Sequence, residues 1–199
     1  MVIRTLYAMN PQLLDDTARR HRWTVEEYLK LVASGVFAED DRIELIDGEL
    51  IHMAPIGDQH AGQVNRLSND LAYRLYRRVV VATQNPIMLD RHSDPEPDIC
   101  LLRWREDFYR GKRPGPADVL LVVEVADTTV RYDREVKMPL YARFGIPEAW
   151  LVDLPGGRVE VYREPVEGRY RRCEYHSEGR IAVLQVPEAV VDVGALFEA

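Results

Sequence analysis

Two acidic residues lie among apolar residues in the middle of the chain. Asp98 stands at the start of the run ICLL, and Glu124 lies inside the run LLVVEVA, where its neighbours are all apolar. A carboxylate in a buried strand is costly unless a metal ion, a cation or a hydrogen-bond network partners it. Lys137 follows further along the chain. Two carboxylates and a lysine are typical of metal-dependent phosphodiester hydrolysis, so we expect these three residues to converge on one divalent ion.

Both acids also have a structural interpretation. Asp98 follows Pro97, which keeps the chain extended and removes one ladder donor, so Asp98 could be a turn residue at the mouth of a strand. Glu124 could form a structural salt bridge instead of binding a metal. Its place near the end of an apolar strand favours a functional role, because open sheets place their ligands at strand ends.

Lys137 has two interpretations of its own. If residues 131–144 are helical, Lys137 shares one face with Asp133 and Tyr141 at four-residue spacing, which favours a surface ion pair with Asp133. The functional alternative is a lysine that reaches over the strand end to hold a water or to stabilise the phosphate in the transition state. Pro139 removes a helical donor, so we expect the helix to kink or restart there.

Two further residues are weaker candidates. Glu44 lies between Ile43 and Leu45 and alternates to the opposite face from both, which favours exposure to solvent. His60 falls in the first turn of an expected long helix. It is either a capping or surface histidine, or a residue close to the metal or the phosphate.

Local signals place these residues on secondary structure. Thr24 and Glu27 form a capping-box pattern for a short helix that ends near Gly35. Asp47-Gly48 favours a hairpin turn. We expect a long helix over 59–78, capped by Asp58, and a helix over 132–144. We expect strands at 79–82, 86–89, 99–102, 119–125, 149–154, 159–163, 170–175 and 181–186. The strand, helix and strand between 119 and 154 predict a parallel crossover in an α/β domain.

Composition limits the class of protein. The chain has 199 residues, of which 46% are hydrophobic and 30% charged, which predicts one globular domain over 1–199 with a peripheral N-terminal segment at 1–21. The net charge of −7 argues against a surface covered with basic residues. No apolar run is long enough to span a membrane and no signal-peptide pattern is present, so we expect a cytoplasmic protein. Cys100 and Cys173 form neither a zinc nor a disulfide pattern.

Pro97-Asp98 followed by Glu124-Val125-Ala126 resembles the core motif of the PD-(D/E)xK nuclease superfamily. More specifically, the chain resembles the Uma-type restriction endonucleases. The similarity runs from about residue 22 onward and is carried by RWTVEEYL, RIELIDGELIHMAPIGDQH, PEPDICLL and LLVVEVADTTVRYDREVKMPLYARFGIPEAWLVD. It implies a restriction-endonuclease-like α/β fold, with a mixed central sheet flanked by helices, here followed by extra C-terminal β-hairpins.

The resemblance also implies a metal site. Its ligands to Mg²⁺, or to Mn²⁺ as a substitute, would be Asp98, Glu124, the backbone carbonyl of Val125 and Glu44. The superfamily's usual lysine lies two residues after the second acid, where this chain has Ala126. In Uma-type proteins a lysine on the following helix is thought to replace it, and Lys137 matches that position.

Three functions remain open on the sequence alone. The first is a Mg²⁺-dependent DNA endonuclease, expected as a homodimer because cutting both strands needs two sites. The second is a catalytically silent nucleic-acid-binding or assembly module, which the negative net charge and Ala126 favour. The third is a metal-dependent enzyme that acts on RNA or on a smaller phosphate ester.

Overall fold

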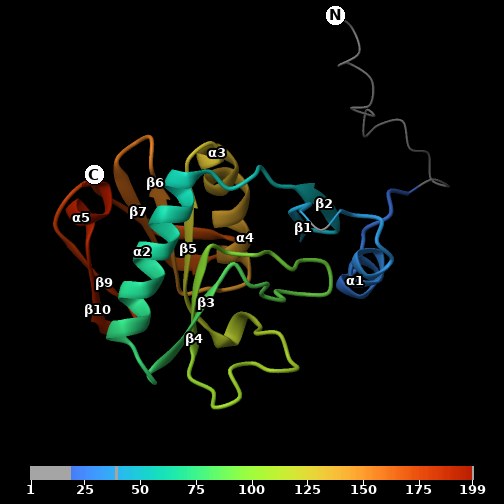
Figure 1. The fold of residues 1–199 in the computed structure, drawn as a ribbon, viewed down its shortest axis with the longest axis horizontal. Helices are drawn as coiled ribbons and strands as arrows, with labels where there is room; N and C mark the ends of the chain where they lie inside the picture. The colour runs from blue at the N-terminus through green and yellow to red at the C-terminus, as the bar shows by residue number, and fades with distance from the viewer. Residues whose placement is uncertain (1–18, 39, 199) are drawn as a thin grey trace, which may run out of the picture.

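A six-stranded mixed sheet forms the centre of the protein (Figure 1). The computed structural model describes residues 19–38 and 40–198, so residues 1–18 of the expected peripheral segment lie outside the described part. The strands lie in sequence order: β3 (Val79–Thr83), β4 (Ile99–Arg103), β5 (Val119–Ala126), β6 (Glu148–Asp153), β7 (Arg158–Val166) and β8 (Arg169–His176). Only β5 and β6 pair in parallel within this sheet.

The connection between β5 and β6 is helical, which confirms the predicted crossover. It consists of α3 (Val130–Tyr132), the π-helical segment η3 (Asp133–Lys137) and α4 (Met138–Arg143). Pro139 has no N–H to continue an α-helical ladder, and the chain takes a wider turn just before it, in which the Met138 N–H donates to the Asp133 carbonyl. The predicted kink is therefore a π-helical turn, and it contains Lys137.

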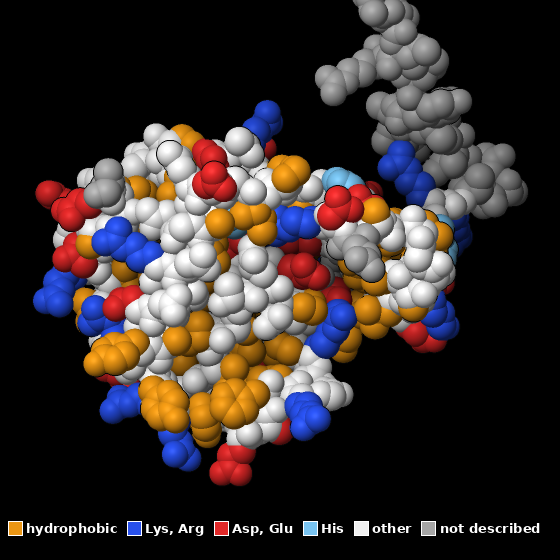
Figure 2. Space-filling model, in the orientation of Figure 1, with side chains coloured by type: hydrophobic (Ala, Val, Ile, Leu, Met, Phe, Trp, Pro, Cys, Tyr) orange, Lys and Arg blue, Asp and Glu red, His pale blue; other side chains and the backbone are white. Residues whose placement is uncertain are grey.

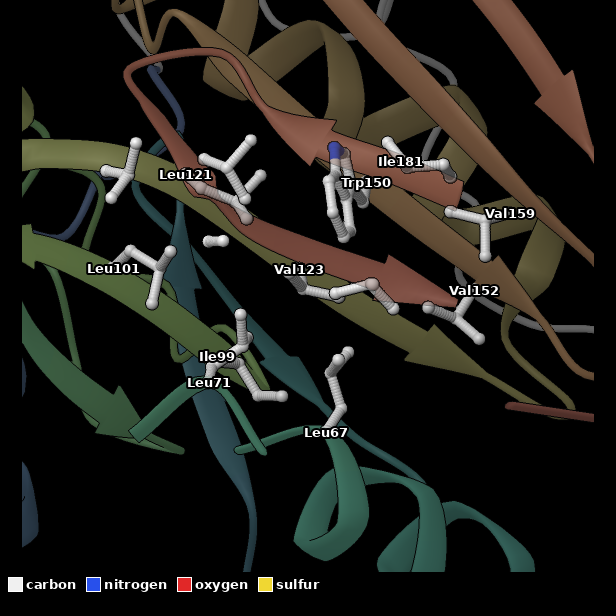
Figure 3. Close-up of a cluster of buried hydrophobic side chains, with 14 of the residues drawn as sticks. Leu67, Leu71, Ile99, Leu101, Leu121, Val123, Trp150, Val152, Val159 and Ile181 are labelled. Atoms are coloured by element: carbon white, nitrogen blue, oxygen red, sulfur yellow. The ribbon is translucent and has the colours of Figure 1, made fainter. Parts of the chain in front are cut away.

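One face of the sheet packs against α2 (Asp58–Arg74) and the C-terminal elements β9 (Arg180–Val183), β10 (Val186–Asp192) and α5 (Val193–Phe197). Figure 3 shows Leu67 and Leu71 of α2 beside side chains from every second position of the strands, such as Ile99 and Leu101 of β4. The fully buried members drawn there include Leu71, Ile99, Leu101, Val123 and Trp150. Each such side chain contributes about 1.5–3 kcal/mol through burial, so this core holds the strands in register.

The opposite face packs against the crossover. Cys100, Val122 and Leu151 point to this side and share a buried cluster with Met138 and Tyr141 of α4. Side chains alternate along a strand, so a residue two positions after Val122 also faces the crossover. The sheet thereby directs one side of β5 towards the segment that carries Lys137.

A small N-terminal lobe lies beside the main body and contains α1 (Val25–Ala33) and the hairpin of β1 (Ile43–Ile46) and β2 (Glu49–His52) (Figure 1). The capping box at Thr24 is confirmed, and so is the hairpin turn, where Asp47 and Gly48 both have positive φ. Leu45 packs against α1, whereas Ile46 belongs to the cluster of the main body. Both faces of β1 are therefore covered.

Four predictions about the elements were wrong. The long helix ends at Arg74 because the following residues form a turn, and Asp58 is its first residue rather than its cap, which is Gly57. Residues 86–89 form no strand, because their backbone N–H groups donate to loop carbonyls of Ser93, Pro95 and Pro114 instead of to a strand ladder. The expected strand at 181–186 divides into β9 and the start of β10. Among the described residues, no helix is long and apolar enough to cross a membrane.

Candidate active site

Strand register places Asp98 next to Glu124. Ile99 on β4 pairs with Val123 on β5 in an antiparallel ladder, so the next residues outward, Asp98 and Glu124, lie side by side. Both carboxylates are buried, with 5% and 3% of their residue surfaces exposed. The adjacent apolar runs that suggested these two acids therefore bring them together, as expected.

Asp98 receives hydrogen bonds from three different elements. The Val125 backbone N–H donates to Asp98 Oδ2 over 2.9 Å, and His60 Nε2 on α2 lies 2.9 Å from the same oxygen. Gln84, just after β3, donates from its side-chain amide to Asp98 Oδ1 over 3.3 Å. These contacts give both oxygens of the buried carboxylate hydrogen-bond partners.

Lys137 lies between two buried glutamates. Its Nζ is 2.9 Å from Glu44 Oε1 and 3.2 Å from Glu124 Oε1. The Tyr141 hydroxyl also donates a short hydrogen bond to Glu124 Oε1. Lys137 and Glu44 are each only 2% exposed. A cation from the crossover thus joins an acid of the N-terminal lobe to the acid of the central strand.

The electrostatics of the cluster follow from burial and from an excess of acids. Burial raises the pKa of Glu124 to about 8, against the opposing effect of Lys137. Burial alone would lower the pKa of Lys137, but Glu124 and Glu44 outweigh it and raise that pKa, so the ammonium stays charged. Burial also raises the pKa of Asp133, which accepts a hydrogen bond from the Thr129 hydroxyl.

These side chains line a single pocket of about 150 Å³ between the lobe and the main body. Figure 2 shows acidic side chains set into this region of the surface. The lobe contributes Arg42 and Glu44, and the body contributes Asp98, Glu124 and Lys137. A small ion or one phosphate group could enter this pocket from solvent.

The donor set fits a hard divalent cation. Carboxylate oxygens are the ligands that Mg²⁺ and Mn²⁺ prefer. Glu44 Oε2 is buried and has no hydrogen-bond partner among the described residues, which leaves one acceptor available. No three acids, histidines or cysteines in the described part already surround one point as ligands. The Lys137 ammonium lies between two of the acids, so an incoming ion requires side chains to rotate.

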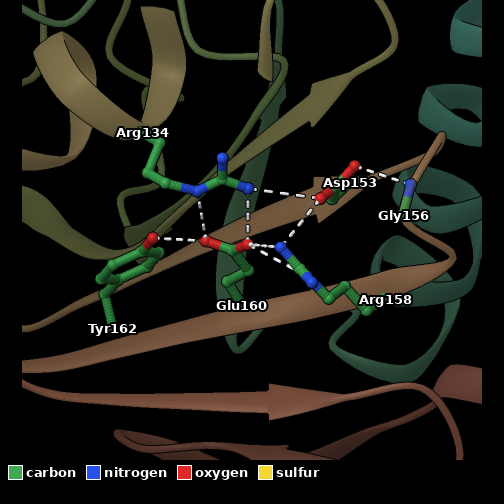
Figure 4. Close-up of polar contacts among 6 residues, drawn as sticks. All are labelled: Arg134, Asp153, Gly156, Arg158, Glu160 and Tyr162. Carbon is green, nitrogen blue, oxygen red and sulfur yellow. Dashed lines mark hydrogen bonds and ion pairs between the residues drawn. The ribbon is translucent and has the colours of Figure 1, made fainter. Parts of the chain in front are cut away.

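A second polar network fixes the segment that carries Lys137 (Figure 4). Arg134 on η3 donates to Glu160 on β7 over 2.7 and 3.1 Å and to Asp153 on β6 over 3.2 Å. Arg158 also donates to Glu160, which is fully buried. The network attaches the π-helical turn to two strands of the sheet.

The structure brings all five predicted side chains, Asp98, Glu124, Lys137, Glu44 and His60, into this pocket. Their catalytic and metal-binding roles stay predictions, as does the role of the Val125 carbonyl.

The exposure predicted for Glu44 was wrong, because the body covers the face of β1 that was taken as open. The surface ion pair between Asp133 and Lys137 was also wrong, since both are buried and Lys137 pairs with Glu44 and Glu124.

Sequence reasoning gave no role to Gln84 or Glu96. Glu96 also lines the pocket, and burial raises its pKa. Its position two residues before Asp98 in an extended segment was an available signal. Gln84 contacts Asp98 from the neighbouring strand, and no local sequence pattern predicts such a contact.

Known proteins resemble this chain in sequence and in fold. Residues 25–193 match the profile of the Uma2 family, described as "Putative restriction endonuclease". The fold resembles the crystal structure of a "putative nuclease belonging to DUF820" from Anabaena variabilis, with a TM-score of 0.67 and 18% identity over 87% of this chain and 97% of the other. No curated protein matches the chain. Because the family match spans most of the sequence, the chain belongs to the Uma2 family of restriction-endonuclease-like proteins.

Proposed function

We propose that the protein is a Mg²⁺-dependent endonuclease that hydrolyses phosphodiester bonds in DNA, with Mn²⁺ as a possible substitute for Mg²⁺. One observation carries the proposal: Lys137 reaches from the crossover to within 3.2 Å of Glu124, beside Asp98, in one pocket. Carboxylates for a metal and a lysine for the phosphate are the parts that this reaction needs. The family match supports a nuclease.

Asp98 and Glu124 would hold the ion, with Glu44 and the Val125 carbonyl as further ligands. When bound, Mg²⁺ polarises a phosphoryl oxygen and lowers the pKa of its water. Lys137 would orient the attacking water and offset negative charge that develops on the phosphate. His60 keeps Asp98 oriented through its contact with Oδ2. Tyr141 fixes Glu124 in the same way from α4.

The position of Lys137 bears on the alternative of a silent module. Ala126 occupies the superfamily's usual lysine position and is fully buried in the cluster that faces the crossover. Lys137 supplies an ammonium to the same side of the sheet, from a different element. This position supports the proposal that Lys137 takes the part of the missing lysine.

The test is cleavage of supercoiled plasmid with Mg²⁺ or Mn²⁺ by the wild type, Asp98→Ala and Lys137→Ala. Lys30→Ala is the matched control, because Lys30 forms an exposed pair with Glu26 and does not line the pocket. We expect metal-dependent cutting by the wild type and the control and none by the two pocket variants. A folded wild type that cuts in neither metal would indicate a silent module. Faster hydrolysis of RNA or mononucleotide esters than of plasmid would contradict the DNA assignment.

Two further proposals accompany this function. We place the enzyme in the cytoplasm, where its DNA substrate and Mg²⁺ are both available. We also propose a homodimer, because two sites are needed to cut both strands of a duplex. Sedimentation velocity with and without DNA measures the mass of the assembly directly, and a monomer under both conditions would exclude the dimer.

A further inference from the structure

Gln84 adopts a backbone conformation that glutamine rarely takes. Its φ is +51°, in the left-handed region, where residues other than glycine, asparagine and aspartate are uncommon. It is the first residue after β3, at the end of the strand next to Asp98. Strained backbone of this kind persists where the surrounding structure holds it, often at functional sites.

The conformation gives Gln84 two contacts with one residue. Its backbone N–H donates to the Asp98 carbonyl over 3.1 Å, and its side-chain Nε2 donates to Asp98 Oδ1 over 3.3 Å. Thr83 pairs with Ile99 in the ladder, so Gln84 and Asp98 form the next pair outward, where the strand would otherwise end. The left-handed turn keeps the amide beside the carboxylate.

The two oxygens of Asp98 are held differently. Oδ2 is bound by the Val125 N–H and by His60, whereas Gln84 is the donor to Oδ1. A carboxylate fixed at one oxygen can still rotate about its Cβ–Cγ bond, and a donor at the second oxygen fixes its plane. Groups that orient metal ligands in this way tune metal affinity without touching the metal.

We propose that Gln84 is a positioning residue, whose amide fixes the plane of the Asp98 carboxylate for binding a divalent cation. This inference rests on the proposed function, since it assigns Asp98 to the metal. The positioning role needs the side-chain amide of Gln84, whereas a role as a turn residue needs only its backbone conformation. A turn role would be satisfied equally well by any side chain that tolerates positive φ.

Gln84→Asn separates the two roles. Asparagine tolerates the left-handed region better than glutamine, so the turn is kept. Its amide is one methylene shorter and does not reach Oδ1. Arg77→Asn is the matched control, because Arg77 has φ +59° in the turn before the other end of β3. Gln84→Gly provides a second variant that fits the turn and has no amide.

We would measure the Tm and the Mn²⁺ affinity by calorimetry, and kcat and KM for plasmid. All three variants should stay folded and melt cooperatively, and the two Gln84 variants melt somewhat lower because they lose one donor to a buried carboxylate. Both Gln84 variants should lose about 10- to 100-fold in metal affinity and in kcat, with KM for DNA unchanged, while Arg77→Asn keeps wild-type values. Wild-type metal affinity and kcat in both Gln84 variants would overturn the inference.

A wild type that neither binds metal nor cuts DNA would refute the proposed function instead. The positioning role is then decided by crystal structures of the wild type and Gln84→Asn. A rotated Asp98 carboxylate in the variant supports the orienting role of Gln84 without the metal, and an unchanged one overturns it.

Discussion

Lys137→Met tests whether the buried ammonium holds the pocket together. Lys137 lies 2.9 and 3.2 Å from two buried glutamate oxygens. At an effective dielectric constant of about 20, each contact corresponds to roughly 5–6 kcal/mol of Coulomb attraction, which the desolvation of the charges largely offsets. Replacing Lys137 leaves the two glutamates buried without a cation. We therefore expect a loss of about 3–5 kcal/mol in the free energy of unfolding.

The loss should depend on pH in a defined direction. Without Lys137, which lowers the pKa of Glu124 in the wild type, the folded variant binds a proton on Glu124 more readily. Because the extra proton is bound in the folded state, the stability of the variant falls more steeply as pH rises. The difference from the wild type should therefore be larger at pH 9 than at pH 6, on either side of the Glu124 pKa of about 8.

Urea unfolding in EDTA at these two pH values measures both effects. Lys30→Met is the control, because Lys30 and Glu26 form the same kind of pair on an exposed face of α1, where little change is expected. Added Mg²⁺ should restore part of the lost stability by replacing the missing charge. A loss below about 1 kcal/mol at pH 9, or an equal loss at both pH values, would refute the reasoning.

Three other predictions follow from single contacts. Because burial raises the pKa of Glu124 to about 8, protons compete with Mg²⁺ below that pH, so Mg²⁺ affinity by calorimetry should rise from pH 6 to 9; a flat profile would contradict this. Glu160→Ala removes the carboxylate that holds Arg134 and should lower the free energy of unfolding by about 1–3 kcal/mol in urea, whereas no change would show that the network is dispensable. Thr24→Ala removes the cap of α1 and should lower stability by about 0.5–2 kcal/mol by thermal melting, while Thr24→Ser keeps it.

The sequence identified the central strands because their patterns are local. An unbroken apolar run at β5 indicates a strand covered on both faces, and a single charged residue inside it is conspicuous. Asp98 and Glu124 then lie side by side because β4 and β5 are antiparallel neighbours, so the start of β4 meets the end of β5. The turn at Asp47-Gly48 and the cap at Thr24 depend on the conformation of a few adjacent residues, and these were predicted correctly.

The features that were missed depend on contacts between distant segments. Glu44 follows the alternation of an exposed hairpin, but the main body covers that face of β1, and only the tertiary arrangement shows it. Gln84 lies in a left-handed turn that places its side chain beside Asp98, which immediately precedes β4. Pro139 correctly indicated an interrupted helix. Nothing in the local sequence, however, distinguishes a kink from the π-helical turn that contains Lys137.

The central claim is that the pocket of Asp98 and Glu124 binds a catalytic divalent ion. The most direct test is a crystal structure of the wild type grown with Mn²⁺, with anomalous scattering used to locate the metal. The account predicts an anomalous peak in contact with both carboxylates, which disappears in Asp98→Ala. A well-ordered wild-type crystal without a peak in this pocket, or with its strongest peak elsewhere, would contradict the account.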